Sequence, residues 1–146
     1  MNWKEFCPDA KPEEWIRMPE VLGKAVRITC HVDACHTHDH LTHRSVTGII
    51  LFINNTPNRW ISKHQKTVET STYGLELVAA RMAIDLIIEM IHSLKSLGMP
   101  IDGPALLLGD NQSVVLNTTV PSSVLKKKHN AVAFHCIHEA IAARIC

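Results

Sequence analysis

Residues 26–33 read Val-Arg-Ile-Thr-Cys-His-Val-Asp. Apolar and polar side chains alternate along them with a period of two, which is typical of a β-strand with one buried face. The alternation predicts a first strand that ends at Asp33, on the polar side of the strand. A polar, turn-like stretch is expected to follow from Ala34 to Arg44.

Two further strands are predicted after this one. The run Val46–Ile53 is almost wholly apolar and predicts a well-buried second strand. Asn54–Pro57 is a turn by composition, because Asn tolerates a left-handed backbone and Pro lacks a donor. Residues 58–63 are expected to form a third strand, which completes an antiparallel hairpin around Trp60.

The rest of the chain favours helices around one more strand. Apolar residues at three-and-four spacing predict a long helix from Thr72 to Leu97, capped by Ser71 or Thr72 and ended by Gly98 and Pro100. The short apolar run 105–108 predicts a central parallel strand that is buried on both faces. A short helix over 111–117 and a final amphipathic helix over 126–145 follow. The fold class is therefore α/β with a mixed sheet, a three-stranded antiparallel meander joined to a βαβ unit.

Composition limits the class of protein. The chain has 146 residues, 46% hydrophobic and 20% charged, which fits one globular domain. Prolines interrupt residues 1–25, which we expect to be a linker or arm, so that the domain spans residues 26–146. No apolar run is long enough for a membrane span, and Met1–Glu5 lacks the apolar core of a signal peptide. Five irregularly spaced cysteines favour a reducing compartment. These features predict an intracellular protein that is neither secreted nor bound to a membrane.

Three carboxylates stand at positions suited to chemistry. Asp33 and Asp110 follow predicted strands, and Glu76 lies early in the long helix among apolar neighbours. Functional groups gather beyond the carboxyl ends of strands in open α/β sheets, where these acids would repel one another without a cation. Oxygen ligands of this kind suit Mg²⁺ or Mn²⁺. The alternative is that each acid merely caps a helix or ends a strand in solvent.

A second cluster is rich in histidine. Five of the ten histidines fall within residues 31–43, namely His31, His36, His38, His40 and His43. Together with Cys30 and Cys35 they could bind zinc, although their spacing matches no standard zinc module. The alternative is a polar loop that happens to contain many histidines.

Several short motifs, in order, carry a resemblance to a known family. They are Val32-Asp33-Ala34, Arg44–Gly48, Trp60–Thr72 running on to Glu76–Ala79, Gly109-Asp110-Asn111-Gln112-Ser113, and Leu125–Asn130. From about Val26 to Arg144 the chain resembles the ribonuclease H domain of the polyproteins of copia-type LTR retrotransposons. The resemblance implies a ribonuclease H-like fold. It also implies metal-dependent hydrolysis of the RNA strand of RNA–DNA hybrids, with Asp33, Glu76 and Asp110 as catalytic, metal-binding carboxylates.

The chain also departs from the family pattern. The family uses two Mg²⁺ or Mn²⁺ ions and a fourth Asp, which follows a further strand, whereas this sequence stops at Cys146. We therefore expect the last strand and helix to be missing, the two-ion site to be weakened, and cleavage to be weak or absent. A smaller departure is Cys35, where relatives often carry an acid.

Contacts with nucleic acid are expected from local basic and amide groups, because the net charge of +1 provides no global basic field. The candidate residues are Lys63, Lys66, Asn111, Gln112, Lys126, Lys127, Lys128 and His129. The alternative for the three lysines is a solvated helix start. The resemblance implies two partners, an RNA–DNA hybrid and the reverse transcriptase domain of the same polyprotein. Two other functions stay open, a non-catalytic nucleic-acid-binding or protein-interaction remnant and another ribonuclease H-like nuclease or transposase.

Overall fold

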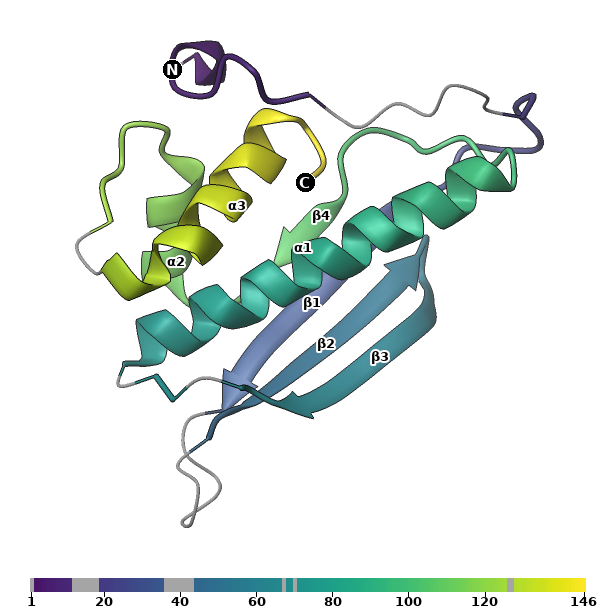
Figure 1. Ribbon diagram of the computed structural model, residues 1–146. Helices are drawn as coiled ribbons and strands as arrows, with labels where there is room; N and C mark the ends of the chain where they lie inside the picture. Colours follow the sequence, from purple (N-terminus) through teal and green to yellow (C-terminus); the bar gives the residue numbers. More distant parts are fainter. Residues whose placement is uncertain (1, 12–18, 36–43, 67, 70, 126–127) are drawn as a thin grey trace.

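A four-stranded mixed sheet forms the centre of the molecule, with the strands in the order β3-β2-β1-β4 (Figure 1). The computed structural model describes residues 2–11, 19–35, 44–66, 68–69, 71–125 and 128–146. Within these, the chain has three α-helices, and the predicted order β-β-β-α-β-α-α is confirmed. The coarse prediction of an α/β fold with a mixed sheet is therefore correct.

The first strand is longer at its end than the sequence pattern predicted. β1 (Ile28–Cys35) continues two residues beyond Asp33, because the alternation continues with Ala34 buried and Cys35 exposed. At its start, Val26 forms only an isolated bridge with Ile101. The turn-like stretch predicted from Ala34 to Arg44 is thus wrong for Ala34 and Cys35, and residues 36–43 lie outside the described part of the chain.

The predicted hairpin is present. β2 (Val46–Ile53) has the predicted bounds and pairs antiparallel with β1 and with β3 (Thr56–His64). The turn is tighter than predicted, because Asn54 takes a left-handed backbone with φ of 56°, so that β3 begins at Thr56. The ladder between β2 and β3 shifts by one residue after Leu51.

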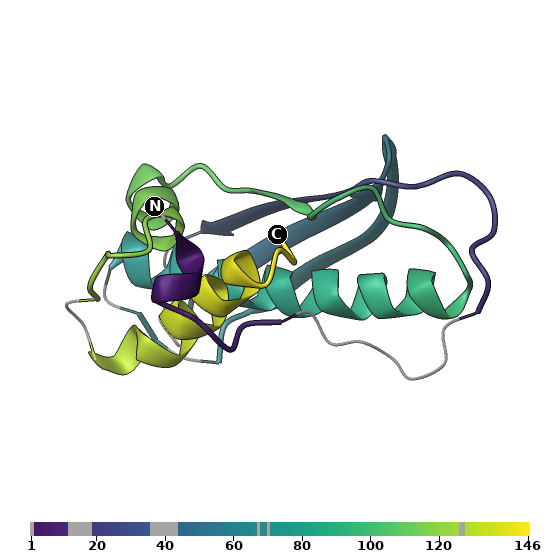
Figure 2. The ribbon, with the colours of Figure 1, turned by 90° about the horizontal axis from the view of Figure 1, so that it is seen from above.

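The long helix α1 (Thr72–Ser96) packs across one face of the sheet, with α3 (Ala131–Ala142) beside it (Figures 1 and 2). The Ser71 hydroxyl oxygen accepts a hydrogen bond from the Gly74 N–H at 3.2 Å and so caps the helix. At the other end, Gly98 has a φ of 72°, which few residues other than glycine adopt. Both ends lie within one residue of the prediction.

β4 (Leu106–Leu108) corrects a prediction about burial. It pairs in parallel with β1, as predicted, but it is an edge strand of the described sheet rather than a central one. Leu106 is 51% and Leu108 38% exposed, because they pair with Thr29 and His31 and so lie on the open face of the sheet, opposite α1. The apolar run indicated a strand correctly but did not indicate where in the sheet the strand lies.

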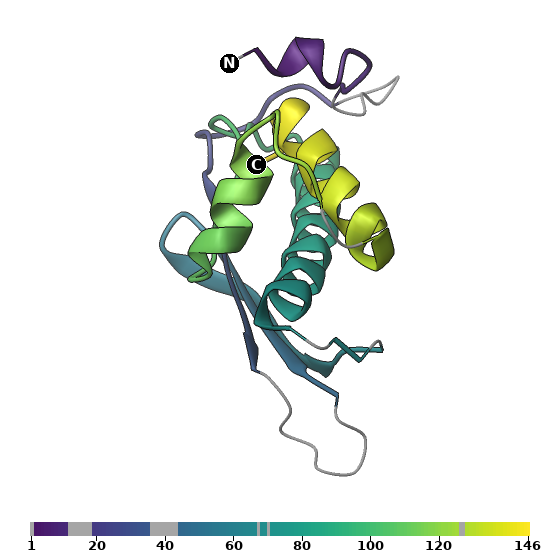
Figure 3. The same cartoon turned by 90° about the vertical axis from the view of Figure 1, so that its left-hand side faces the viewer.

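Two shorter helical segments complete the C-terminal part. α2 (Gln112–Thr119) packs against α3. The predicted helix over 126–145 is shorter in the structure, with a 3-10 turn over Lys128–Asn130 before α3 begins at Ala131. The N-terminal segment lies beside α3 (Figure 3), where the Trp3 ring meets the His138 ring edge-on at a centroid distance of 5.2 Å. The division into an arm and a domain at residues 25 and 26 stays a prediction.

Apolar side chains fill the space between α1 and the sheet, among them Ile28, Ile49, Leu51 and Ile87. The opposite face of the sheet leaves Trp60 73% exposed and Ile50 43% exposed. None of the described helices is long and apolar enough to cross a membrane.

Candidate metal centre

Three carboxylates from distant parts of the chain meet at one end of the sheet. One ligand oxygen from each of Asp33, Glu76 and Asp110 lies within 4.8 Å of the other two. Strands β1, β3 and β4 run in the same direction, so their carboxyl ends lie at the end of the sheet where the three carboxylates meet. β1 and β4 are neighbours in the sheet and pair in parallel, which brings their carboxyl ends together.

Asp33 lies near the end of β1 on the face of the sheet opposite α1, and it is exposed. Its partner across the β1–β2 ladder is Gly48. A Cβ atom at Gly48 would have the Asp33 carbonyl oxygen as its nearest contact, at 4.0 Å. A methyl group at this position would therefore fit without a clash.

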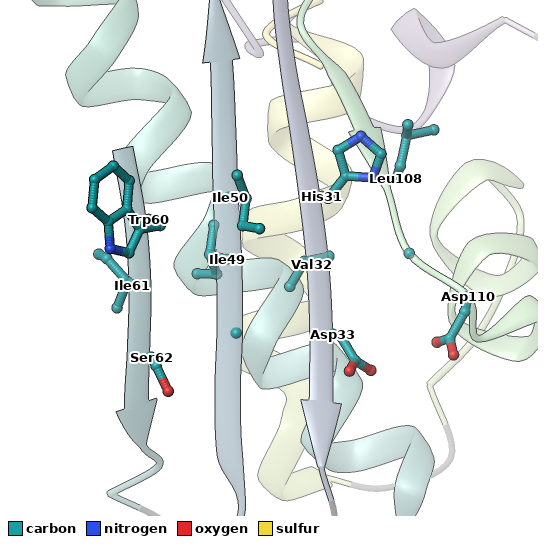
Figure 4. A pocket seen from close by; sticks show the side chains of 12 residues that line it. His31, Val32, Asp33, Ile49, Ile50, Trp60, Ile61, Ser62, Leu108 and Asp110 are labelled. Atoms are coloured by element: carbon teal, nitrogen blue, oxygen red, sulfur yellow. The ribbon is translucent and has the colours of Figure 1, made fainter. Parts of the chain in front are cut away.

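Asp110 lies two residues after the end of β4, with Gly109 between them. The next residue, Asn111, begins α2, because its Oδ1 accepts a hydrogen bond from the Val114 N–H at 3.2 Å. This cap fixes where the chain turns from strand to helix, and Asp110 lies at that turn. Its side chain is exposed and points toward Asp33, as Figure 4 shows.

Glu76 reaches the same place from α1 and is buried. Its Oε1 accepts a hydrogen bond from the Ala34 N–H at 3.3 Å. The β1–β4 ladder ends at His31 and Leu108, so Ala34 lies beyond β4 and its N–H is available for the carboxylate. Burial raises the pKa of Glu76 from its ordinary value of 4.5 to about 7. The Ala34 hydrogen bond opposes this rise, and the charges of Asp110 and Asp33 add to it.

The three side chains fit a divalent cation. They supply only oxygen ligands, which is the donor set that Mg²⁺ and Mn²⁺ prefer. A cation would also relieve the repulsion that favours protonation of Glu76. The arrangement is therefore an acidic cluster that could hold a metal ion.

An open hollow of about 760 Å³ lies beside the cluster, and Figure 4 shows its walls. One row of the sheet contributes His31, Ile50 and Trp60 to it, and the next row contributes Asp33 and Ser62. The hollow is thus acidic at one end and apolar and aromatic at the other. Two of the three carboxylates, Asp33 and Asp110, line it directly.

The residues predicted to contact nucleic acid divide into three groups. Lys63 and Lys66 are exposed at the end of β3, and Gln112 and Lys128 are also exposed. Asn111 caps α2, with its Oδ1 accepting a backbone hydrogen bond from Val114, and its predicted contact with nucleic acid stays a prediction. Lys126 and Lys127 lie outside the described residues, and the side chain of His129 is not described either.

The predicted zinc cluster is mostly outside the described chain, because residues 36–43 are not described. Of its members, His31 lies on the open face of β1, with its ring 5.5 Å from that of Phe52. Cys30 is fully buried on the opposite side of the strand, and burial raises the pKa of its thiol to about 12. Cys30 and His31 therefore point to opposite faces of the sheet and cannot share one ion.

One residue near the centre was missed by the sequence patterns. Gln65 lies in the polar stretch Lys63–Lys66, between two lysines that are exposed, yet it is only 1% exposed. Gln65 comes after the end of β3, where the alternation of buried and exposed residues no longer applies, so no sequence pattern indicates that it is buried.

No protein-family model matches the chain, and no curated protein matches it. The fold and the geometry of the carboxylates are therefore the observations on which a function can be argued.

Proposed function

We propose that this chain is a ribonuclease H-like domain of the kind found in copia-type retrotransposon polyproteins. In this proposal Asp33, Glu76 and Asp110 bind Mg²⁺ or Mn²⁺ and act in hydrolysis of the RNA strand of an RNA–DNA hybrid. The mixed sheet and the helix order are compatible with such a fold. The reverse transcriptase domain of the same polyprotein is the proposed partner.

One observation carries the proposal. Three acids that are widely separated in sequence meet within 4.8 Å. They are the same three residues to which the resemblance assigned metal binding. Structural acids at strand ends and on helices are usually apart and solvated, because close carboxylates repel one another. Their convergence at the carboxyl ends of parallel strands is typical of a functional site.

The side chains divide the work by their positions. Asp33 and Asp110 line the open hollow, so they hold the solvent side of the site, where a phosphodiester can approach. Glu76 holds the side toward α1, and the Ala34 N–H restrains its carboxylate. A bound divalent cation supplies Lewis-acid activation of water and neutralises charge on the phosphate oxygens.

Substrate orientation is assigned to groups at the same end of the sheet. Lys63 and Lys66 at the end of β3, together with Lys128 before α3, would contact phosphates without reading base sequence. Contacts of this kind make binding depend on salt concentration. Since the resemblance implies a fourth carboxylate and three meet among the described residues, we propose that cleavage by residues 1–146 is weak.

Cleavage of an end-labelled RNA–DNA hybrid in Mg²⁺ or Mn²⁺ tests the proposal. We expect the RNA strand to be cut at internal positions and Asp110→Asn to remove this cleavage. Asp102→Asn is the matched control, because Asp102 is an exposed acid that pairs with Arg27 and lies outside the cluster. The same RNA in an RNA–RNA duplex should stay intact.

The result also separates the proposal from its main alternative. Salt-dependent binding of the hybrid without cleavage, in both Mg²⁺ and Mn²⁺, would favour a non-catalytic remnant of the same fold. Cleavage that persists in Asp110→Asn would contradict the assigned site.

A further inference from the structure

Gln65 makes three hydrogen bonds from a buried position directly after β3. Its backbone N–H donates to the Ser45 carbonyl oxygen at 2.8 Å. Its side-chain Nε2 donates to the Thr47 hydroxyl oxygen at 2.9 Å and to the Leu75 carbonyl oxygen at 2.8 Å. One side chain thus joins β2 to the first turn of α1.

These bonds complete a closed chain of contacts that passes through Glu76. Leu75 is the residue before Glu76, so one bond from Gln65 holds the backbone from which Glu76 projects. Thr47 is the partner of Ala34 across the β1–β2 ladder, and the Ala34 N–H donates to Glu76 Oε1. The Gln65 side-chain amide therefore connects the backbone beside Glu76 with Thr47, the ladder partner of the residue whose N–H binds the Glu76 carboxylate.

We infer that Gln65 is a positioning residue that holds Glu76 in register with Ala34 and hence with Asp33 and Asp110. The inference rests on the proposed function for its catalytic meaning, but the contacts that carry it are independent of any cation. A small shift or rotation of the first turn of α1 would move the Glu76 carboxylate relative to the two strand-borne acids.

Packing alone does not account for an amide at this position. Gln65 Oε1 is buried and has no hydrogen-bond partner among the described residues. Burying such an oxygen is costly, and an apolar side chain of similar length would avoid the cost. The two donated bonds are what an apolar side chain cannot supply.

Two variants remove the hydrogen bonds of Gln65 Nε2 in different ways. Gln65→Met keeps the length of the side chain and removes both Nε2 bonds. Thr47→Val keeps the shape and removes only the bond to β2, whereas Thr47→Ser keeps the hydroxyl and serves as the conservative rescue. Thr118→Val is the control, because Thr118 is also buried and donates to a carbonyl, that of Val114 in α2.

The first measurement is hydrogen exchange of the Ala34 amide, followed by NMR without divalent cation at a temperature where every variant is folded. We expect Gln65→Met and Thr47→Val to speed exchange of this amide by about tenfold relative to Val32, which lies two residues earlier in β1. Thr47→Ser and Thr118→Val should leave this ratio unchanged. A ratio that stays at the wild-type value in both Gln65→Met and Thr47→Val would overturn the inference. If Gln65→Met does not fold, Thr47→Val decides.

The second measurement is calorimetric titration of the folded proteins with Mn²⁺. We expect Gln65→Met to weaken binding by about 10-fold or more, the range found when groups that orient metal ligands are lost. Thr118→Val should bind like the wild type. Binding by Gln65→Met within about twofold of the wild type contradicts the inference. If the wild type itself binds no Mn²⁺, the proposed function fails, while the amide exchange still decides whether Gln65 positions Glu76.

Discussion

The two sides of the carboxylate cluster differ in how they are built. On the solvent side, Asp33 and Asp110 are exposed at strand ends. On the helix side, Glu76 is buried, accepts a backbone hydrogen bond and has a raised pKa. From this difference we expect that replacing either exposed acid by its amide changes the stability of the fold only slightly. The buried acid, in contrast, couples protonation, stability and cation binding.

The largest expected effect concerns protonation on the helix side. The pKa of Glu76 rises from 4.5 to about 7 on folding, so between these values the folded state holds a proton that the unfolded state has released. Stability from this group is therefore fully present below pH 4.5 and is lost as the pH rises toward 7. Without divalent cation, this loss should amount to about 3 kcal/mol.

Urea unfolding at several pH values between 4.5 and 7.5, in the presence of a chelator, measures this loss. In Glu76→Gln the amide does not titrate, so the stability of the variant should lack this fall. The quantity to compare is the difference between wild type and variant, because groups that do not interact with Glu76 titrate equally in both. Parallel stability curves across this pH range would show that Glu76 is not buried as described.

The next effect is stabilisation by a divalent cation, which would bind the exposed acids and Glu76 together. At pH 8, where Glu76 is ionised, Mg²⁺ at one hundred times its dissociation constant should raise the free energy of unfolding by about 2.7 kcal/mol. Asp33→Asn removes a ligand from the exposed side, so at the same Mg²⁺ concentration a tenfold or greater loss of affinity should cut the gain to about 1.4 kcal/mol or less. The metal-free stability of this variant should change by less than about 0.5 kcal/mol. A full Mg²⁺ effect in this variant would exclude Asp33 from the site.

How far the sequence predicted these features depends on the residue. The apolar run Val46–Ile53 predicted β2 to the residue, and Ser71 and Gly98 predicted the ends of α1, because these signals are local. The three acids were predicted as a cluster, partly from the resemblance. The exposure of β4 and the burial of Gln65 were not predicted, because both depend on which segments lie alongside, and no local pattern encodes that.

A smaller effect on stability is expected from alanine substitutions at two glycines, Gly74 on the helix side of the cluster and Gly48 on the solvent side. A Cβ atom at Gly74, in the first turn of α1, would collide with Glu69 Oε2 and lie 3.0 Å from Asn130 Nδ2. Both neighbours are buried, so we expect Gly74→Ala to destabilise the fold by about 1 kcal/mol, after the gain in helix propensity is included. Gly48→Ala, beside Asp33, should change stability by less than about 0.5 kcal/mol, because its nearest contact is at 4.0 Å. Thermal unfolding of the two variants checks this order, and equal effects would contradict it.

The smallest effect is expected for an exposed acid away from the cluster. Asp102 pairs with Arg27 at 2.9 Å, and both side chains are more than half exposed. Asp102→Asn should therefore cost under about 0.5 kcal/mol in chemical unfolding and leave Mg²⁺ stabilisation intact. A loss of the Mg²⁺ effect in this variant would mean that stabilisation comes from general surface charge and not from the cluster.

The most direct test of the central claim is calorimetric titration of the folded chain with Mn²⁺ at pH 8. If the three carboxylates form one site, the wild type binds Mn²⁺ saturably. Asp33→Asn, Glu76→Gln and Asp110→Asn each weaken this binding by at least about 10-fold, while Asp102→Asn binds like the wild type. Absence of saturable binding in the wild type, or wild-type binding in any of the three cluster variants, would contradict the account.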